Sequence, residues 1–278
     1  MRNGRYISDY HCHSRISPDA KVPMIDMARA AVEAGIDELC FTDHVEPLVF
    51  FRWNDAPRPI GSYDWDAMVR EFRAAQEAYG ERIKLRMGAE LGEAPFALEV
   101  MESFLESAPP LDFTIGSAHV FRREDGTVAE LYWNTEPDEA MWYSEFDGYV
   151  AELERLVDWG KFSVLGHLTL PLRYAKELAG LDLSFDRYEE RLREILRRAI
   201  EKGIGIELNT NRGHDPLPGA KWLKLYRELG GEIVTMGSDA HTPDYLGCAM
   251  EENQDLLRAC GFRYFTTYEQ GKPTFHQL

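Results

Sequence analysis

The stretch YISDYHCH, residues 6–13, joins a segment typical of a short β-strand (residues 6–10) to two histidines that stand two positions apart. Residues two apart on an extended chain point to the same face, so His11 and His13 can reach one centre. Imidazole nitrogen is a common ligand of zinc, iron and manganese. The first strand is therefore expected to carry part of a metal site at its carboxyl end.

The same arrangement recurs along the chain. Seven segments are predicted as strands, at residues 6–10, 37–42, 83–87, 113–115, 162–165, 204–208 and 232–236. Six of them are followed by histidines or carboxylates, and the set comprises His11, His13, His44, Glu90, His119, His167, Asp239 and His241, with Asp19 shortly after the first pair. The remaining segment ends in Asn209 and Thr210, which are not a usual metal pair. A lone histidine is more often structural, but agreement between six strand ends indicates one polynuclear metal site.

Helical segments separate the predicted strands. They lie at residues 23–34, 64–79, 96–105, 139–159, 188–200, 220–229 and 252–259. This alternation predicts βαβ units and a parallel sheet. Because about seven units follow one another without a linker or repeat, we expect an α/β fold in which one closed (β/α) barrel spans residues 1–278. An open doubly wound sheet is the alternative. In a barrel the site is built at the carboxyl ends of the strands, where the candidate ligands fall.

Two irregular, aromatic-rich stretches follow candidate ligands. Residues 46–62 come after His44, and residues 121–137 come after His119. Long loops of this kind often act as lids, so we expect both over the mouth of the barrel. The alternative is that they only cover the core.

Composition favours a soluble globular protein. The chain has 278 residues, of which 44% are hydrophobic and 28% charged, and no apolar stretch is long enough to cross a bilayer. Residues 1–6 lead directly into the first strand and leave no room for a signal peptide. The four cysteines are scattered without CxxC spacing, which favours reduced thiols and a cytoplasmic protein.

The net charge of −17 argues against nucleic acid as the main partner, because a phosphate backbone requires a basic surface. It does not exclude a small phosphorylated substrate. Surface charges are screened beyond roughly 8 Å at physiological ionic strength, whereas a metal ion in direct contact acts at shorter range. Three divalent ions among Asp19, Glu90 and Asp239 would make the local charge positive.

Six short motifs together resemble the PHP (polymerase-and-histidinol-phosphatase) superfamily. They are HCHS (11–14), FTDH (41–44), GAE (88–90), IGSAH (115–119), LGH (165–167) and GSDAH (237–241). The resemblance runs in order from about residue 6 to 270. Within the superfamily the chain is most similar to the stand-alone histidinol-phosphate phosphatases, through ELNT (207–210), GSDAHTP (237–243) and CGFRYF (260–265).

This resemblance implies a distorted (β/α)7 TIM-like barrel with two to three divalent ions, which zinc, iron or manganese would supply. By motif, the first ion would lie among His11, His13, Glu90 and Asp239; Glu90 would bridge to a second ion held with His119 and His167; and His44 and His241 would hold the third with Asp19. Many members of the group carry histidine near position 19. An aspartate that only forms a turn after Pro18 is the alternative there.

Two arginines are candidates for binding the substrate phosphate. Arg173, six residues after His167, resembles the phosphate clamp of the group, and its planar fork suits phosphate. An exposed surface arginine is the alternative. Arg212 is the second candidate, although the group more often places its basic residue slightly later. Candidates for the general acid are Tyr174, Asp43, His214 and a metal-bound water; Asp43 can instead orient a neighbouring side chain.

The expected activity is hydrolysis of a phosphate monoester, with Glu90, Asp239 and Arg173 as catalytic residues. Clustered cations lower the pKa of a bridging water, so that hydroxide becomes available as the nucleophile. L-Histidinol phosphate is the leading substrate by resemblance. Its cationic groups require a carboxylate and an aromatic wall in the substrate pocket. The candidates for the carboxylate are Glu46, Glu93, Asp215 and Asp244, and those for the aromatic wall are Trp53, Tyr132 and Trp133. The alternatives are a nucleotide, cyclic phosphodiester or phosphotyrosine substrate, or a metal-binding PHP domain without catalysis. The sequence does not predict the oligomeric state.

Overall fold

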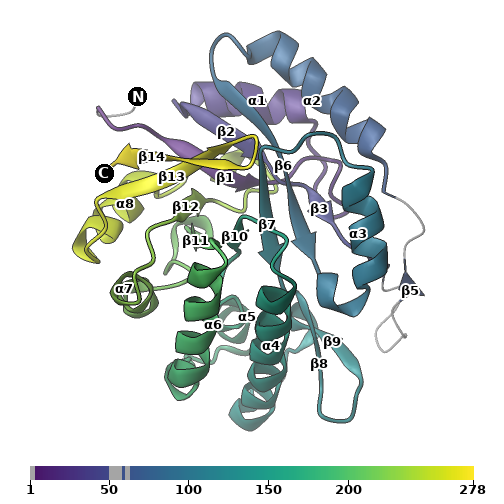
Figure 1. Ribbon diagram of the computed structural model, residues 1–278, viewed down its shortest axis with the longest axis vertical. Coiled ribbons are helices and arrows are strands. Elements are labelled where there is room, and N and C mark those ends of the chain that lie inside the picture. Colours follow the sequence, from purple (N-terminus) through teal and green to yellow (C-terminus); the bar gives the residue numbers. More distant parts are fainter. Residues whose placement is uncertain (1–3, 50–57, 60–62) are drawn as a thin grey trace.

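The computed structural model describes residues 4–49, 58–59 and 63–278 (Figure 1). Most of the predicted loop 46–62 therefore lies outside the described residues, and so does Trp53. Among the residues that are described, no helix is both long enough and apolar enough to cross a membrane.

A parallel sheet that nearly closes on itself forms the centre of the molecule (Figure 1). Its strands follow the order β1-β2-β6-β7-β10-β11-β12, and β3 adds to β6. Their bounds are β1 Ser8–Cys12, β2 Glu38–Phe41, β3 His44–Val45, β6 Lys84–Gly92, β7 Phe113–Ser117, β10 Val164–Leu165, β11 Gly205–Asn209 and β12 Val234–Gly237. The end of β1 meets the segment after β12, where Asp239 N donates to His11 O at 2.7 Å and His13 N donates to Ala240 O at 2.9 Å. The predicted distorted (β/α)7 barrel is confirmed.

Helices follow the strands and cover the outside of the sheet (Figure 1). They are α1 Met24–Glu33, α2 Trp65–Tyr79, α3 Leu98–Glu106, α4 Glu139–Trp159, α5 Pro171–Ala179, α6 Glu189–Glu201, α7 Ala220–Glu228 and α8 Met250–Ala259. Helix α4 has the predicted bounds, because the side chain of Asp138 accepts from Ala140 N and Met141 N at its start and Gly160 (φ 68°) ends it. Short 3₁₀ turns are η1 Ala94–Phe96, η2 Leu131–Trp133, η3 Asp186–Tyr188, η4 Asn211–Gly213 and η5 Pro243–Tyr245.

Three two-stranded sheets complete the described fold. They are β4 Leu48–Val49 with β5 Arg58–Pro59, β8 Val120–Arg122 with β9 Val128–Glu130, and β13 Tyr264–Glu269 with β14 Lys272–Gln277. The β13–β14 hairpin helps to fill the barrel interior, because Tyr268 packs with Tyr10, Cys40, Phe113, Ile115 and Val164. Tyr10 Oη also donates to Tyr268 O at 2.9 Å. The site must therefore lie at the opposite, carboxyl end of the strands.

The structure corrects the predicted elements in three places. His11 and Glu90 lie within β1 and β6 rather than past them, because parallel pairing continues to the rim, where Glu90 is opposite Ile115. The stretch 121–137 is not wholly irregular. It contains the β8–β9 hairpin, which turns at Gly126 (φ 82°), and Asp125 Oδ1 accepts from Thr127 there. Helix α5, which begins with Pro171 and carries Arg173, was not predicted, because its buried residues are Pro171, Arg173 and Ala175 and not a stripe of large apolar side chains.

Candidate metal centre

The structure brings all nine predicted ligands together at the carboxyl ends of the barrel strands. Nitrogen–oxygen contacts of at most 3.6 Å link every member to another; the members are His11, His13, Asp19, His44, Glu90, His119, His167, Asp239 and His241. The barrel topology explains this convergence, because the carboxyl ends of parallel strands meet at one rim.

Glu90 is the centre of the cluster. Its Oε1 lies 3.0 Å from His167 Nε2 and 3.2 Å from His119 Nε2, and its Oε2 lies 2.9 Å from His44 Nδ1. The carboxylate is only 1% exposed. Burial by itself raises the pKa of Glu90, but attraction to His11 and the other imidazoles holds that pKa well below its usual range. Glu90 is therefore an ionised carboxylate that can bridge two cations.

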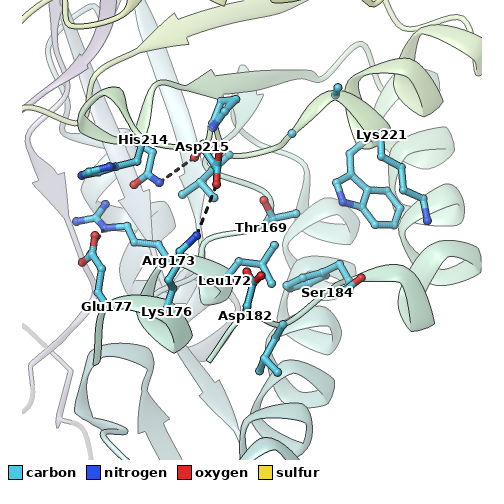
Figure 2. Close-up of a pocket in the computed structure, with 18 of the residues that line it drawn as sticks. Thr169, Leu172, Arg173, Lys176, Glu177, Asp182, Ser184, His214, Asp215 and Lys221 are labelled. Carbon is cyan, nitrogen blue, oxygen red and sulfur yellow. Dashed lines mark hydrogen bonds and ion pairs between the residues drawn. The ribbon is translucent and has the colours of Figure 1, made fainter. Parts of the chain in front are cut away.

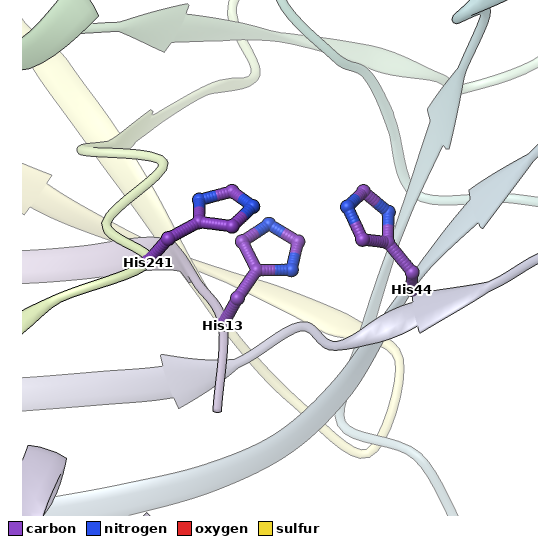
Figure 3. A group of neighbouring side chains, drawn as sticks. All are labelled: His13, His44 and His241. Atoms are coloured by element: carbon purple, nitrogen blue, oxygen red, sulfur yellow. The ribbon is translucent and has the colours of Figure 1, made fainter. Parts of the chain in front are cut away.

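Among the residues that the structure describes, four groups of side chains could each share an ion, because the donor atoms within each group lie within 4.8 Å of one another. The groups are His11, His13 and Asp239; His11, Glu90 and His167; His13, His44 and His241; and His44, Glu46 and His119. Figure 3 shows the third group, in which imidazoles from distant parts of the chain converge, with the rings of His13 and His241 only 4.1 Å apart. Glu46 was not predicted as a ligand; its position two residues after His44 was the signal for it.

Several buried donor atoms of the cluster make no hydrogen bond within the described chain. They are His11 Nε2, His13 Nε2, His44 Nδ1, His167 Nδ1 and Glu90 Oε2. Buried polar atoms normally have partners, so these atoms fit a site that is completed by metal ions. Burial and the neighbouring His44 lower the pKa of His13 to about 3, which leaves its imidazole neutral as a ligand must be. The donor set of imidazole and carboxylate suits zinc, iron or manganese.

A second layer of carboxylates orients the cluster. Glu207 Oε1 lies 2.7 Å from His11 Nδ1, and Glu207 Oε2 accepts from His167 N at 2.7 Å. This role of Glu207 was not predicted, although Glu207 and Asn209 share the two-residue spacing of His11 and His13. Asp43 is fully buried and accepts from Ser14 N and Ser17 Oγ, so it holds the turn after β1. It fits the predicted orienting alternative better than that of general acid.

A cavity of about 770 Å³ opens above the cluster. Besides predicted ligands, its lining includes Glu46, Glu130, Tyr132, Trp133, Arg173, Tyr174 and Arg212. Arg173 is 7% exposed, and its Nη1 lies 3.3 Å from Asp239 Oδ2. The alternative of an exposed surface arginine is therefore wrong. Arg212 lines the same cavity, with its guanidinium 5.7 Å from the ring centre of Tyr245.

A second cavity, of about 860 Å³, also has Arg173 in its lining (Figure 2). His214 and Asp215 line this second cavity and not the first. Asp244 lines neither cavity in the part of the chain that the structure describes. His214 as general acid, and Asp215 or Asp244 as the substrate carboxylate, thus lose their geometric support. Glu93 is 4% exposed and accepts from His119 N at 2.8 Å, so it too is committed elsewhere.

The family model described as PHP domain matches residues 9–211, which is most of the chain. The chain belongs to the PHP family. Seven of the nine predicted ligands lie in the matched range, and barrel closure adds Asp239 and His241 from beyond it.

Relatives of this PHP domain match nearly its whole length. It is 28% identical to histidinol-phosphatase of Lactococcus lactis subsp. lactis over 267 residues, which cover 94% of this chain and 93% of the relative. It is 29% identical to a probable histidinol-phosphatase of Thermotoga maritima over 265 residues, with 92% and 93% covered. The crystal structure of the Lactococcus lactis histidinol phosphate phosphatase, complexed with zinc, L-histidinol and phosphate, superposes with a TM-score of 0.75 at 26% identity, covering 96% of this chain and 98% of that one.

Proposed function

We propose that this PHP domain is a metal-dependent phosphomonoesterase that hydrolyses L-histidinol phosphate to L-histidinol and inorganic phosphate. The observation that carries the proposal is the composition of this cavity. Arg173 lines it and contacts Asp239, one of the nine clustered potential metal ligands. The full-length similarity to histidinol-phosphatases, one of them complexed with L-histidinol and phosphate, supports the named substrate.

Two to three divalent ions, supplied by zinc, iron or manganese, would be held as the resemblance implies: by His11, His13, Glu90 and Asp239; by Glu90, His119 and His167; and by His44, His241 and Asp19. Such ions, when bound, lower the pKa of water and neutralise phosphate charge. Glu46 is a further candidate ligand, since it lies 3.5 Å from both His44 and His119.

The remaining steps belong to protein side chains. Arg173 is held by Asp239, 3.3 Å from its Nη1, and by Glu177, 3.7 Å from its Nε, and the remaining N–H groups of its guanidinium can hold phosphate oxygens in line for attack. Arg212, which lines the same cavity, would be a second contact to the substrate phosphate. Burial raises the pKa of Tyr174, so its hydroxyl keeps its proton at neutral pH and can donate to the alcohol oxygen as the ester P–O bond breaks.

The free cysteines support a reducing compartment for this enzyme. Cys12, Cys40 and Cys260 are buried, and none of the four cysteines forms a disulfide in the described chain. We therefore propose a cytoplasmic location.

Elemental analysis of the purified protein, combined with a phosphate-release screen, tests the function. We expect two to three divalent ions per chain and a kcat/KM for L-histidinol phosphate that exceeds the values for nucleotides, cyclic phosphodiesters and phosphotyrosine by orders of magnitude. Glu90→Ala and Asp239→Ala should abolish hydrolysis. If the enzyme prefers one of the other esters, that ester and not L-histidinol phosphate is its substrate. Activity that persists in both variants would refute the mechanism. A metal-loaded protein that hydrolyses no ester would be a non-catalytic PHP domain.

A further inference from the structure

The cavity above the metal centre carries opposite charges on different loops. Arg173 from α5 and Arg212 from η4 provide fixed positive charge. Glu130, at the end of β9, faces the same cavity and was not among the residues predicted to contact substrate. A substrate with an anionic and a cationic end would match this distribution of charge.

Glu130 is a partly buried carboxylate in the wall of this cavity. No lysine or arginine forms an ion pair with it in the part of the chain that the structure describes, although Tyr132 donates a hydrogen bond to it. The charged groups that act on it are two further carboxylates, Glu93 and Glu46, and the imidazole of His119, which opposes them. Burial, reinforced by Glu93, raises the pKa of Glu130 to about 7. A partly buried carboxylate in this setting is stabilised when a cation binds beside it.

An aromatic wall connects Glu130 to the arginine. Tyr132 hydrogen-bonds to Glu130 and packs against Tyr174, with the two ring centres 6.4 Å apart. Arg173 in turn lies 5.3 Å from the centre of the Tyr174 ring. Two ring contacts therefore separate the anion-binding end from the carboxylate. That is the scale of a small amino-alcohol phosphate, whose apolar part can lie along the two tyrosines.

The two carboxylates that act on Glu130 are already engaged with the metal cluster. Glu93 accepts from His119 N, and Glu46 lies 3.5 Å from both His44 and His119 within a potential metal group. Glu130 belongs to none of the potential metal groups found among the described residues, and no ion pair joins it to a predicted ligand there.

We propose that Glu130 binds the cationic group of the substrate and, positioned by Tyr132, makes the enzyme selective for phosphate monoesters of amines or imidazoles. This inference rests on the proposed function and adds a residue that recognises the leaving alcohol. Arg173 selects for phosphate, whereas Glu130 selects for the positive charge carried by the rest of the molecule.

Kinetics on two esters test the inference. The cationic ester is L-histidinol phosphate, whose leaving group carries positive charge, and the comparison is 4-nitrophenyl phosphate, called the uncharged ester because its leaving group has no cationic group. Glu130→Gln keeps the shape and removes the charge, so we expect kcat/KM for the cationic ester to fall about 10- to 100-fold, mainly through KM, with the uncharged ester and the metal content unchanged. Tyr132→Phe should give a smaller loss of the same kind, and Glu130→Asp should restore part of the preference.

Glu124→Gln is the matched control, because Glu124 is exposed at the turn of the same hairpin. It should leave both esters unaffected. If Glu130→Gln keeps the full preference for the cationic ester, or slows both esters equally, the inference is wrong while the proposed function stands. If the wild-type enzyme itself does not prefer the cationic ester, the proposed function fails, and the role of Glu130 fails with it.

Discussion

Glu207 Oε1 lies 2.7 Å from Nδ1 of His11, so the other ring nitrogen of His11, Nε2, faces Glu90 and Asp239. The two residues belong to β11 and β1, which are separated by most of the sequence and lie on either side of β12 in the barrel. A carboxylate bound to the far nitrogen of a histidine ligand fixes the tautomer and raises the basicity of the metal-binding nitrogen.

We predict that Glu207→Ala weakens metal binding about 10- to 100-fold, which is typical when such an orienting partner is lost. Glu207→Gln retains an oxygen acceptor and should lose less. Competition with a chromogenic chelator measures the affinity directly. Glu201→Ala is the control, because Glu201 is exposed at the end of α6. An unchanged metal affinity in the Glu207→Ala protein would show that this contact does not affect metal binding by His11.

Removal of Arg173 should lower kcat/KM for the phosphate ester about 100- to 1,000-fold, the usual effect of deleting one donor aimed at the reacting group. Arg173→Lys should recover little, since lysine cannot supply the two-pronged contact. The dissociation constant for inorganic phosphate should rise in parallel.

Lys176→Ala provides the comparison for Arg173. Lys176 lies on the same helix, but it lines the second cavity and its Nζ lies 3.8 Å from Asp215 Oδ2 (Figure 2). Phosphate binding should not change in this variant. If Lys176→Ala impaired hydrolysis as much as Arg173→Ala, the substrate would occupy the second cavity instead.

Asp19 should be needed for the binding of only one of the metal ions. Its Oδ2 lies 3.0 Å from His241 Nε2 and 3.6 Å from His44 Nε2, while its side chain is 54% exposed. We expect Asp19→Ala to reduce the bound metal by about one ion per chain and to leave the ions at the buried ligands in place, as elemental analysis after dialysis would show. Asp19→His should restore the lost ion. Full occupancy in Asp19→Ala would assign the aspartate to the turn after Pro18.

The ligand cluster could be predicted because its signals are local. Each of His44, His119 and His167 follows or ends a segment with the composition of a strand, and the barrel rule states that such positions converge. Two-residue spacing then placed His11 with His13 on one face. Neither step needs knowledge of side-chain packing.

The contacts to the substrate could not be predicted in the same way. Glu130 reaches the cavity only because residues 120–130 form a hairpin that turns back over the barrel, and the sequence of that stretch carries no clear strand pattern. Asp215 follows Arg212 closely in sequence, yet the η4 turn directs it to the second cavity. Sequence patterns report which face of an element is buried, but not which loops meet across a cavity.

Glu38 allows a prediction about stability at the other end of the barrel. Its carboxylate is 1% exposed and accepts from Tyr6 Oη at 2.6 Å, Tyr10 Oη at 2.7 Å and Arg86 Nε at 2.8 Å. Burial raises the pKa of Glu38, but these donors outweigh burial and lower its pKa below the usual value. A lowered pKa means that ionised Glu38 stabilises the fold at neutral pH, and that this contribution is lost as the pH falls from about 4.5 through the lowered pKa.

Glu38→Gln should therefore cost about 2–3 kcal/mol of unfolding free energy at pH 7, which is the value of charge-assisted hydrogen bonds in a buried site. The difference between wild type and variant should shrink as the pH falls from about 5 to 3, because the wild-type carboxyl becomes neutral as well. Urea denaturation of metal-loaded protein at several pH values measures this difference. Protonation of the metal ligands lowers the stability of both proteins alike, so its effect cancels in the difference between them. The exposed Glu33, at the end of α1, gives the control Glu33→Gln, which should follow the wild type throughout. A constant gap between wild type and Glu38→Gln down to pH 3 would show that shape, and not charge, accounts for the role of Glu38.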